Sequence, residues 1–166
     1  MGLNISSSSL SESISPTLSN LQAFRILDLS SYSLVDSIPP ELGNMSSLSM
    51  LLLLFSNGLF GTIPKELGIL TQLTVMRIDD NKLSGRIPAE LSNCRILTVL
   101  TIATCKLASL IPAKLSKLTQ LQILKLQENN LNGSIHKELG KCGSLRVISL
   151  AYNNLEGEIP VGLSNL

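Results

Sequence analysis

Residues 70–93 read LTQLTVMRIDDNKLSGRIPAELSN, and this stretch decides the fold. Four of its apolar residues, Leu70, Leu73, Met76 and Ile78, are spaced at intervals of three, three and two. An interval of two is typical of a short strand whose alternate side chains point to the same side. An interval of three is not a strand period. It is what a coiling backbone needs to return apolar side chains repeatedly to one interior.

The same pattern recurs along the chain at intervals of 24 or 25 residues. Three apolar columns run through six units without a miss. They are Leu34, Leu59, Leu83, Leu107, Leu131 and Leu155; Ile38, Ile63, Ile87, Ile111, Ile135 and Ile159; and Leu42, Leu67, Leu91, Leu115, Leu139 and Leu163. Self-similarity at a fixed period of this length indicates a solenoid in which each unit packs on its neighbours. We predict one array over 1–166, with a partial unit at 1–20, full units at 21–44, 45–69, 70–93, 94–117, 118–141 and 142–165, and the start of another at 166.

An asparagine column follows the short strand of most units. An inward Asn can bond backbone groups with both its amide donors and its carbonyl acceptor, so stacked copies would form a ladder that satisfies buried polar backbone. Its members are Asn57, Asn81, Asn129 and Asn153. Tyr32 and Cys105 break this column, and we expect those units to be locally weaker.

Two further columns predict the turns. A Gly column predicts tight turns, with Asp36 and Ser109 as substitutes; its members are Gly61, Gly85, Gly133 and Gly157. Pro follows the Ile column in most units, which suits an edge or turn segment. The second unit is one residue longer, and Asn57 aligns only if Leu52 and Leu54 take the inward strand positions. Because residues 51–54 are all Leu, the register is ambiguous there.

The unit as a whole, with its SGRIP, NGSIH and EGEIP segments, resembles the plant-specific class of leucine-rich repeats. That resemblance covers essentially the whole chain. It implies an α/β-type solenoid of mostly β structure with 3₁₀ or irregular turns, a right-handed superhelix with a parallel sheet on its concave side. It also implies a second short strand near the Ile-Pro column.

Proteins that carry repeats of this class include the ectodomains of plant receptor-like kinases and receptor-like proteins, and the polygalacturonase-inhibiting proteins. Cysteine-paired caps, usual in these ectodomains, have no counterpart here. The chain also opens without a signal peptide and has neither a membrane span nor a kinase domain. We expect a fragment, a truncated product or an excerpt from a longer ectodomain. Uncapped ends predict fraying or self-association at Leu3–Leu18 and Leu150–Leu166.

Composition and motifs argue against several classes of function. The formal net charge is +1, so nothing suggests a nucleic-acid partner, and the segment itself should not contact a membrane. Cys94 and Cys142 lie two units apart, about 10 Å, too far for a disulfide. We interpret both, together with Cys105, as buried small hydrophobes. His136 stands alone, so no metal site is expected. The chain carries no catalytic motif, and we predict neither an enzyme nor a cofactor, although a parent receptor could carry a Ser/Thr kinase domain elsewhere.

Three Asn-x-Ser sequons occur, at Asn4, Asn44 and Asn132. Asn44 is the strongest candidate for glycosylation because it lies on the turn into a strand. Asn132 precedes Gly133 in a tight turn and is less available. Asn4 lies in the incomplete unit. A glycan on Asn44 would stay off the concave face.

Side chains that flank the inward pair on each short strand should face the concavity. They vary from unit to unit, which is typical of a surface carrying specific information and equally of unconstrained solvent-facing positions. An apolar anchor beside charges is a plausible hot spot. The residues we select as ligand-binding are Leu53, Phe55, Arg77, Asp79, Asp80, Lys125, Glu128 and Tyr152.

The resemblance implies a non-catalytic recognition module of a cell-surface plant receptor, located outside the cell. Its partners would be a protein or peptide ligand, with a co-receptor or a secreted enzyme as further candidates. A secreted inhibitor of the polygalacturonase-inhibitor type is the alternative, and a dominant electrostatic patch would favour it. Ice binding ranks last, because it calls for a flat, regular array of small polar groups.

Overall fold

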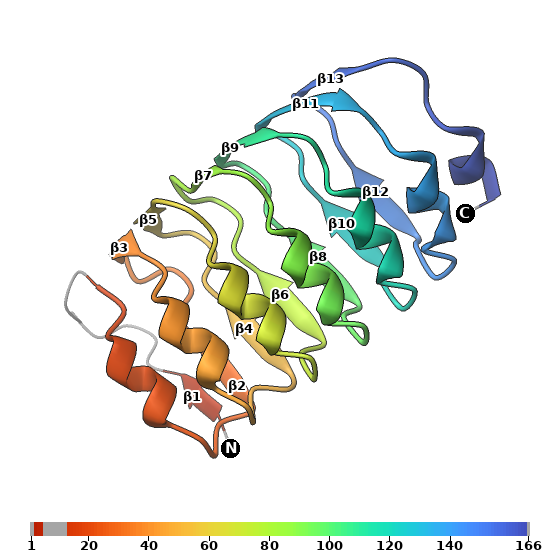
Figure 1. The fold of residues 1–166 in the computed structure, drawn as a ribbon. Coiled ribbons are helices and arrows are strands. Elements are labelled where there is room, and N and C mark those ends of the chain that lie inside the picture. The colour runs from red at the N-terminus through yellow and green to blue at the C-terminus, as the bar shows by residue number, and fades with distance from the viewer. Residues whose placement is uncertain (1, 5–12, 166) are drawn as a thin grey trace.

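The computed structural model describes residues 2–4 and 13–165, which wind into a solenoid of stacked coils (Figure 1). One strand from each coil joins a seven-stranded parallel sheet on the concave side, in the order β1-β2-β4-β6-β8-β10-β12. Each strand pairs with the strand one repeat away, so that Met76 lies beside Leu100. The strands are β1 (Gly2–Asn4), β2 (Ile26–Asp28), β4 (Leu51–Leu53), β6 (Val75–Arg77), β8 (Val99–Thr101), β10 (Ile123–Lys125) and β12 (Val147–Ser149).

A second series of short strands follows in each coil, just ahead of the Ile-Pro column. It forms a four-stranded sheet and a two-stranded sheet, also parallel. These strands are β3 (Val35–Ser37), β5 (Gly58–Phe60), β7 (Ser84–Gly85), β9 (Lys106–Ser109), β11 (Asn130–Ser134) and β13 (Asn154–Glu156). The expected mixture of strands and 3₁₀ turns in a parallel solenoid is confirmed.

A five-residue 3₁₀ helix closes each coil on the side away from the large sheet (Figure 1). Pro39, Pro64, Pro88 and Pro112 precede four of these helices with φ near −64°. The pyrrolidine ring fixes that φ, so the Pro column sets where each helix begins. His136 takes the same place with φ −64°. The helices are η1 (Pro16–Asn20), η2 (Pro40–Asn44), η3 (Lys65–Ile69), η4 (Ala89–Asn93), η5 (Ala113–Lys117), η6 (Lys137–Lys141) and η7 (Val161–Asn165).

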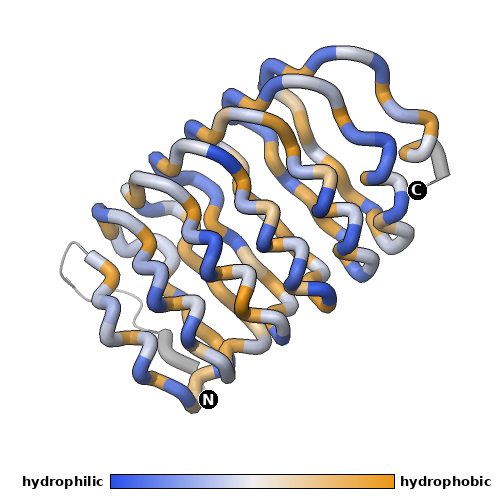
Figure 2. The backbone as a smooth tube through the Cα atoms, viewed as in Figure 1, coloured by the Kyte–Doolittle hydropathy of each residue, from blue (hydrophilic) through white to orange (hydrophobic). Residues whose placement is uncertain are grey.

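The repeated apolar columns form one continuous core along the solenoid axis. Figure 2 shows hydrophobic segments recurring at matching places in successive coils. Leu52 and Leu54 are fully buried, and Leu52 pairs with Leu27 of the preceding coil. The register predicted for the longer second unit is therefore confirmed, with Leu51, Leu53 and Phe55 partly exposed on the sheet face.

The asparagine column binds backbone groups of two successive coils. Asn81 donates through Nδ2 to the carbonyls of Ile78 and Asp79 in its own turn and of Leu54 in the coil before, at 2.9–3.1 Å. Its Oδ1 accepts the N–H of Leu59 at 3.0 Å. Asn57, Asn129 and Asn153 make the equivalent bonds. These side chains thus fasten each coil to the next.

Cys105 interrupts this series with weaker bonds. Its thiol donates to the carbonyl oxygens of Ile78 and Ala103, at 3.8 and 3.4 Å. Sulfur is a poor donor compared with an amide. The contacts that Asn would make are therefore only partly replaced in this coil.

The Gly column has φ between +68° and +78°, as its tight turns require. Ser109 adopts φ +82° in the same column, although it carries a Cβ. A side chain in this region strains the backbone.

We expect Ser109→Gly to raise the free energy of unfolding by about 1 kcal/mol, measured as a higher urea midpoint at unchanged slope. Ser109→Ala keeps the Cβ and should change little, so an equal gain from Ala would refute the backbone explanation.

Apolar columns are less covered in the last described coil. Ile148, Leu150 and Leu155 are partly exposed, and Ile159 is 77% exposed where Ile111 is 3% exposed. The fraying and self-association expected at Leu3–Leu18 and Leu150–Leu166 stay predictions. Residues 1, 5–12 and 166 lie outside the described residues, as does the side chain of Asn4.

Candidate functional site

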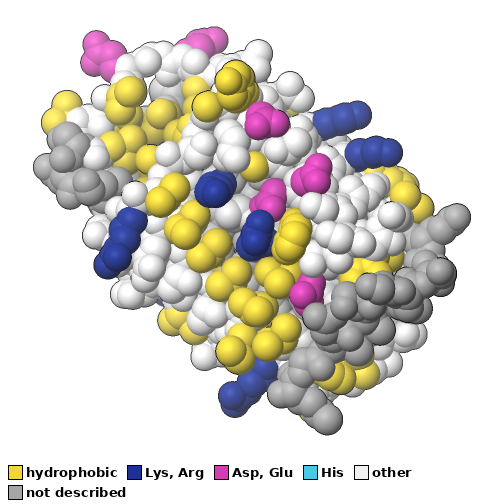
Figure 3. Space-filling model, turned by 180° about the vertical axis from the view of Figure 1, so that it is seen from behind, with side chains coloured by type: hydrophobic (Ala, Val, Ile, Leu, Met, Phe, Trp, Pro, Cys, Tyr) yellow, Lys and Arg dark blue, Asp and Glu magenta, His cyan; other side chains and the backbone are white. Residues whose placement is uncertain are grey.

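The outer face of the large sheet carries an apolar stripe along one edge. The six strands from β2 to β12 in this sheet each contribute their first residue, and because the strands are in register these residues line up from coil to coil. The apolar stripe consists of Ile26, Leu51, Val75, Val99, Ile123 and Val147. Figure 3 shows this side of the molecule, with a band of hydrophobic side chains next to charged ones.

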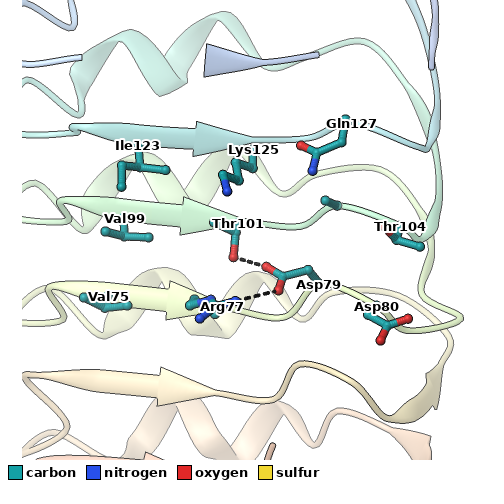
Figure 4. Close-up of a pocket in the computed structure, with 11 residues that line it drawn as sticks. Val75, Arg77, Asp79, Asp80, Val99, Thr101, Thr104, Ile123, Lys125 and Gln127 are labelled. Carbon is teal, nitrogen blue, oxygen red and sulfur yellow. Dashed lines mark hydrogen bonds and ion pairs between the residues drawn. The ribbon is translucent and has the colours of Figure 1, made fainter. Parts of the chain in front are cut away.

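A shallow groove of about 610 Å³ lies over β6, β8 and β10 (Figure 4). Its two long edges differ in chemistry. Val75, Val99 and Ile123 line one edge, and Asp80, Thr104 and Gln127 stand at the other (Figure 4). The residues between and around them are Arg77, Asp79, Thr101, Ala103 and Lys125.

Arg77 is held in place at the floor of the groove. Its guanidinium lies 4.3 Å from the centroid of the Phe55 ring, and its Nη2 donates to Asp79 Oδ2 at 3.3 Å. Asp79 also accepts a hydrogen bond from the Thr101 hydroxyl on the next strand. These contacts restrict an Arg that is still 43% exposed. A pre-positioned, half-exposed Arg loses little conformational freedom when a partner binds.

Burial raises the pKa of the Asp79 carboxyl, and the charge and hydrogen bond of Arg77 oppose that rise. The folded protein therefore favours protonated Asp79 more than the unfolded chain does. Its contribution to stability is greatest below the usual value of 3.8 and is lost as pH rises through the folded pKa.

Asp79→Asn removes this charge and keeps an acceptor for Thr101 and Arg77. We expect the variant to equal or exceed the wild type in stability at pH 7, and the difference to shrink as pH falls toward 3.8. Urea unfolding across that range measures it. Asp80→Asn, at the exposed neighbour, is the control for losing one negative charge. A difference that grows as pH falls would contradict the expectation.

A row of exposed or partly exposed residues with positive φ forms the other edge of the face, which we call the rim. They lie directly before the asparagine column, with φ from 51° to 61°, and none is Gly. The rim consists of Ser31, Ser56, Asp80, Thr104, Glu128 and Tyr152. Glu128 Oε2 accepts a hydrogen bond from Thr104 Oγ1 at 3.3 Å, and the side chain of Asp80 stands one strand away on the other side. Sequence reasoning missed this backbone conformation, because no Gly marked it.

The structure places the eight selected residues in three groups. Phe55, Arg77 and Asp79 are in contact, with Leu53 on the neighbouring strand β4. Asp80 and Lys125 line the same groove. Glu128 and Tyr152 lie on the rim outside the groove lining, and Tyr152 is 82% exposed.

Further groove residues were not selected from the sequence. They are Thr101, Ala103, Thr104 and Gln127, together with the stripe members Val75, Val99 and Ile123. The signal that could have found them is their spacing, one repeat or two from Arg77, Asp79 and Asp80. Gln127 Oε1 is buried and accepts no hydrogen bond within the described structure.

Other reactive groups are not arranged for chemistry in the described residues. Cys94 and Cys142 are buried free thiols and Cys105 is partly buried. Burial raises the pKa of Cys94 and of Cys105 to about 11, and it raises that of Cys142. The thiols are therefore protonated near neutral pH and unreactive. Among residues 2–4 and 13–165, no cluster of His, Cys, Asp and Glu could hold a metal ion, and no helix has the length and apolar character to cross a bilayer.

Comparison with known proteins gives a family and a set of similar structures. The family model described as a leucine-rich repeat region matches residues 3–161. The ectodomain of the plant membrane receptor kinase GASSHO1/SCHENGEN3 from Arabidopsis thaliana, solved with CASPARIAN STRIP INTEGRITY FACTOR 2, is 44% identical with a TM-score of 0.96. The match covers 99% of this chain and 20% of that one. No curated protein sequence matches the chain.

Two other solved structures are also similar. The Arabidopsis receptor kinase HAESA, in complex with the peptide hormone IDA and the co-receptor SERK1, is 37% identical with a TM-score of 0.88, over 92% of this chain and 26% of that one. A plant ice-binding protein is 33% identical with a TM-score of 0.77, over 83% and 45%. The chain therefore spans about a fifth to a quarter of these two receptor ectodomains.

Proposed function

The chain belongs to the leucine-rich repeat family, and we propose that it is a non-catalytic, extracellular recognition segment that binds a peptide on its large sheet. The observation that carries this proposal is the groove over β6, β8 and β10 with its restrained Arg77. Receptor ectodomains in complex with a protein or peptide factor share the fold at 37–44% identity. Signalling would depend on other parts of a parent receptor.

A displayed library of random linear peptides tests the proposal. The immobilised chain should select clones whose binding is lost with Val99→Lys, which places a long charged side chain in the centre of the apolar edge. Ala108→Lys is the matched control, because it puts the same side chain on exposed β9 of the same coil. Failure to select any clone, or clones indifferent to Val99→Lys, would refute peptide recognition by this face.

Two other functions fit the face less well. Ice binding has one similar structure in its favour. However, this face mixes apolar residues with Arg77, Lys125 and Asp80, so it lacks a regular array of small polar groups. Inhibition of a secreted enzyme would be favoured by a dominant charged patch. The groove instead combines two cations with two acids.

We also propose that Asn44 is glycosylated if the chain enters the secretory pathway. Asn44 is exposed at the end of η2, while Met45 beside it is fully buried. A glycan there would leave from the 3₁₀-helix side and keep the sheet face clear. Asn132 is also exposed, but within β11 and before Gly133 at φ +68°.

Expression of the chain behind a secretion signal in plant cells tests this prediction. We expect a glycosidase-sensitive band that Asn44→Gln shifts down by one glycan. Ser46→Ala should give the same shift, because it destroys the sequon and leaves Asn44 in place. An unshifted pattern in both variants would show that Asn44 is not used. Asn4→Gln and Asn132→Gln report on the other two sequons.

A further inference from the structure

Two charges at the floor of the groove, Arg77 and Asp79, are already paired within the protein. Arg77 binds Asp79, which also accepts from Thr101. Lys125 is exposed and forms no ion pair among the described residues, although it is close enough to lower the pKa of the same carboxyl. A ligand carboxylate placed on Arg77 would lie close to the Asp79 oxygen that is 3.3 Å from Nη2. Like charges at such a separation repel strongly in a partly buried site. The Arg77–Asp79 pair therefore disfavours an anionic ligand group at Arg77.

The charged groups at the opposite edge are carboxylates without a cation. Asp80 and Glu128 are exposed, and neither forms an ion pair among the described residues. Glu128 Oε2 accepts a hydrogen bond from Thr104 Oγ1 at 3.3 Å, and its exposed carboxylate can accept further donors. Both carboxylates call for N–H donors and favour a positive charge.

The apolar stripe runs parallel to this edge across the strands (Figure 4). Val75, Val99 and Ile123 remain partly exposed there, so a ligand side chain can still bury their surface. A peptide lying along the solenoid axis would thus have an apolar edge on one flank and an acceptor-rich edge on the other. In an extended peptide, successive side chains point to opposite sides.

We propose, on the premise that the face binds a peptide, that its ligand is an extended segment alternating apolar residues with Lys or Arg. The apolar side chains lie on the stripe at Val75, Val99 and Ile123. A basic side chain on the other flank contacts Asp80 or Glu128. Charge complementarity with the rim selects against acidic peptides.

The first readout is the sequence of those library clones whose binding is abolished by Val99→Lys. We expect Lys and Arg to be enriched at alternate positions between apolar residues. A synthetic copy of a selected peptide should then bind the double variant Asp80→Asn/Glu128→Gln about three- to tenfold more weakly. Its affinity for that variant should also depend less on salt. Both substitutions keep the shape of the side chain, and Asn tolerates the positive φ of residue 80.

Glu41→Gln/Glu90→Gln is the matched control, since it removes two exposed negative charges on η2 and η4, away from the sheet face. Affinity for this variant should equal that of the wild type. Clones that depend on Val99 but lack basic residues, or that bind the rim variant unchanged, would overturn the inference and leave peptide recognition standing. A library that yields no clone overturns both.

Discussion

Asn81→Ala is expected to lower the free energy of unfolding by about 3 kcal/mol, because it strips hydrogen bonds from buried backbone groups of two coils. The amide of Asn81 serves the carbonyls of Leu54, Ile78 and Asp79, and its Oδ1 serves the N–H of Leu59. Asn81 is 8% exposed, so water cannot easily replace it. Each unpaired buried group costs about 1–3 kcal/mol, and partial relaxation keeps the total below the sum. Urea unfolding followed by circular dichroism measures the loss.

Two further variants separate the ladder from a general effect of losing an amide. Asn154→Ala removes an exposed Asn that directly follows the ladder residue Asn153, and it should cost little. Cys105→Asn should stabilise the chain by about 1 kcal/mol, since an amide replaces a weak sulfur donor. An Asn81→Ala variant no less stable than Asn154→Ala would show that the ladder contributes nothing.

Much of the fold could be predicted because the core residues recur at the same positions of every repeat. Each coil buries the same positions, so a residue such as Leu52 can be assigned by its alignment even within the run from Leu51 to Leu54. The inward columns have a single physical requirement, which is apolar volume. Local turns were predictable where Gly marked them, and the substitutes Asp36 and Ser109 also adopt positive φ.

The groove could be predicted only in part, because its shape depends on neighbouring strands. Arg77 and Asp79 were selected for their charge, whereas Thr101 attracts no attention until β8 places it beside Asp79. Glutamine side chains are usually exposed, so the sequence gives no reason to select Gln127. Only the packed structure shows that its Oε1 is buried. Tyr152 was selected because it is amphipathic and the repeat pattern points it outward. It lies beyond the residues that line the groove.

One structural column, a series of small residues, was not identified from the sequence although it recurs there in successive units. The fourth residue of each helix from η2 to η6 is small, and these residues are Gly43, Gly68, Ser92, Ser116 and Gly140. A Cβ built on Gly68 would lie 2.4 Å from the carbonyl oxygen of Glu90 in the next coil. Successive helices therefore stack backbone to backbone, and small residues at this column set their separation.

Gly68→Val is consequently expected to destabilise the chain by about 3 kcal/mol, at the upper end of what overpacking usually costs. The obstacle is backbone, the Glu90 carbonyl carbon and oxygen at 2.6 and 2.4 Å, so no side-chain rotation relieves it. The two coils would have to separate, which also weakens the core beneath them. The midpoint of urea unfolding measures the change.

Gly143→Val is the matched control, because a Cβ there meets nothing within 4 Å. Gly68→Ser should lie between the two, since Ser92 fills the same column one coil later while only 2% exposed. That order, with Val at residue 68 the worst and Val at residue 143 nearly neutral, follows only if contact between coils sets the cost. Equal losses at residues 68 and 143 would point instead to the lower flexibility of valine in either turn, and the spacing of the coils would then need another cause.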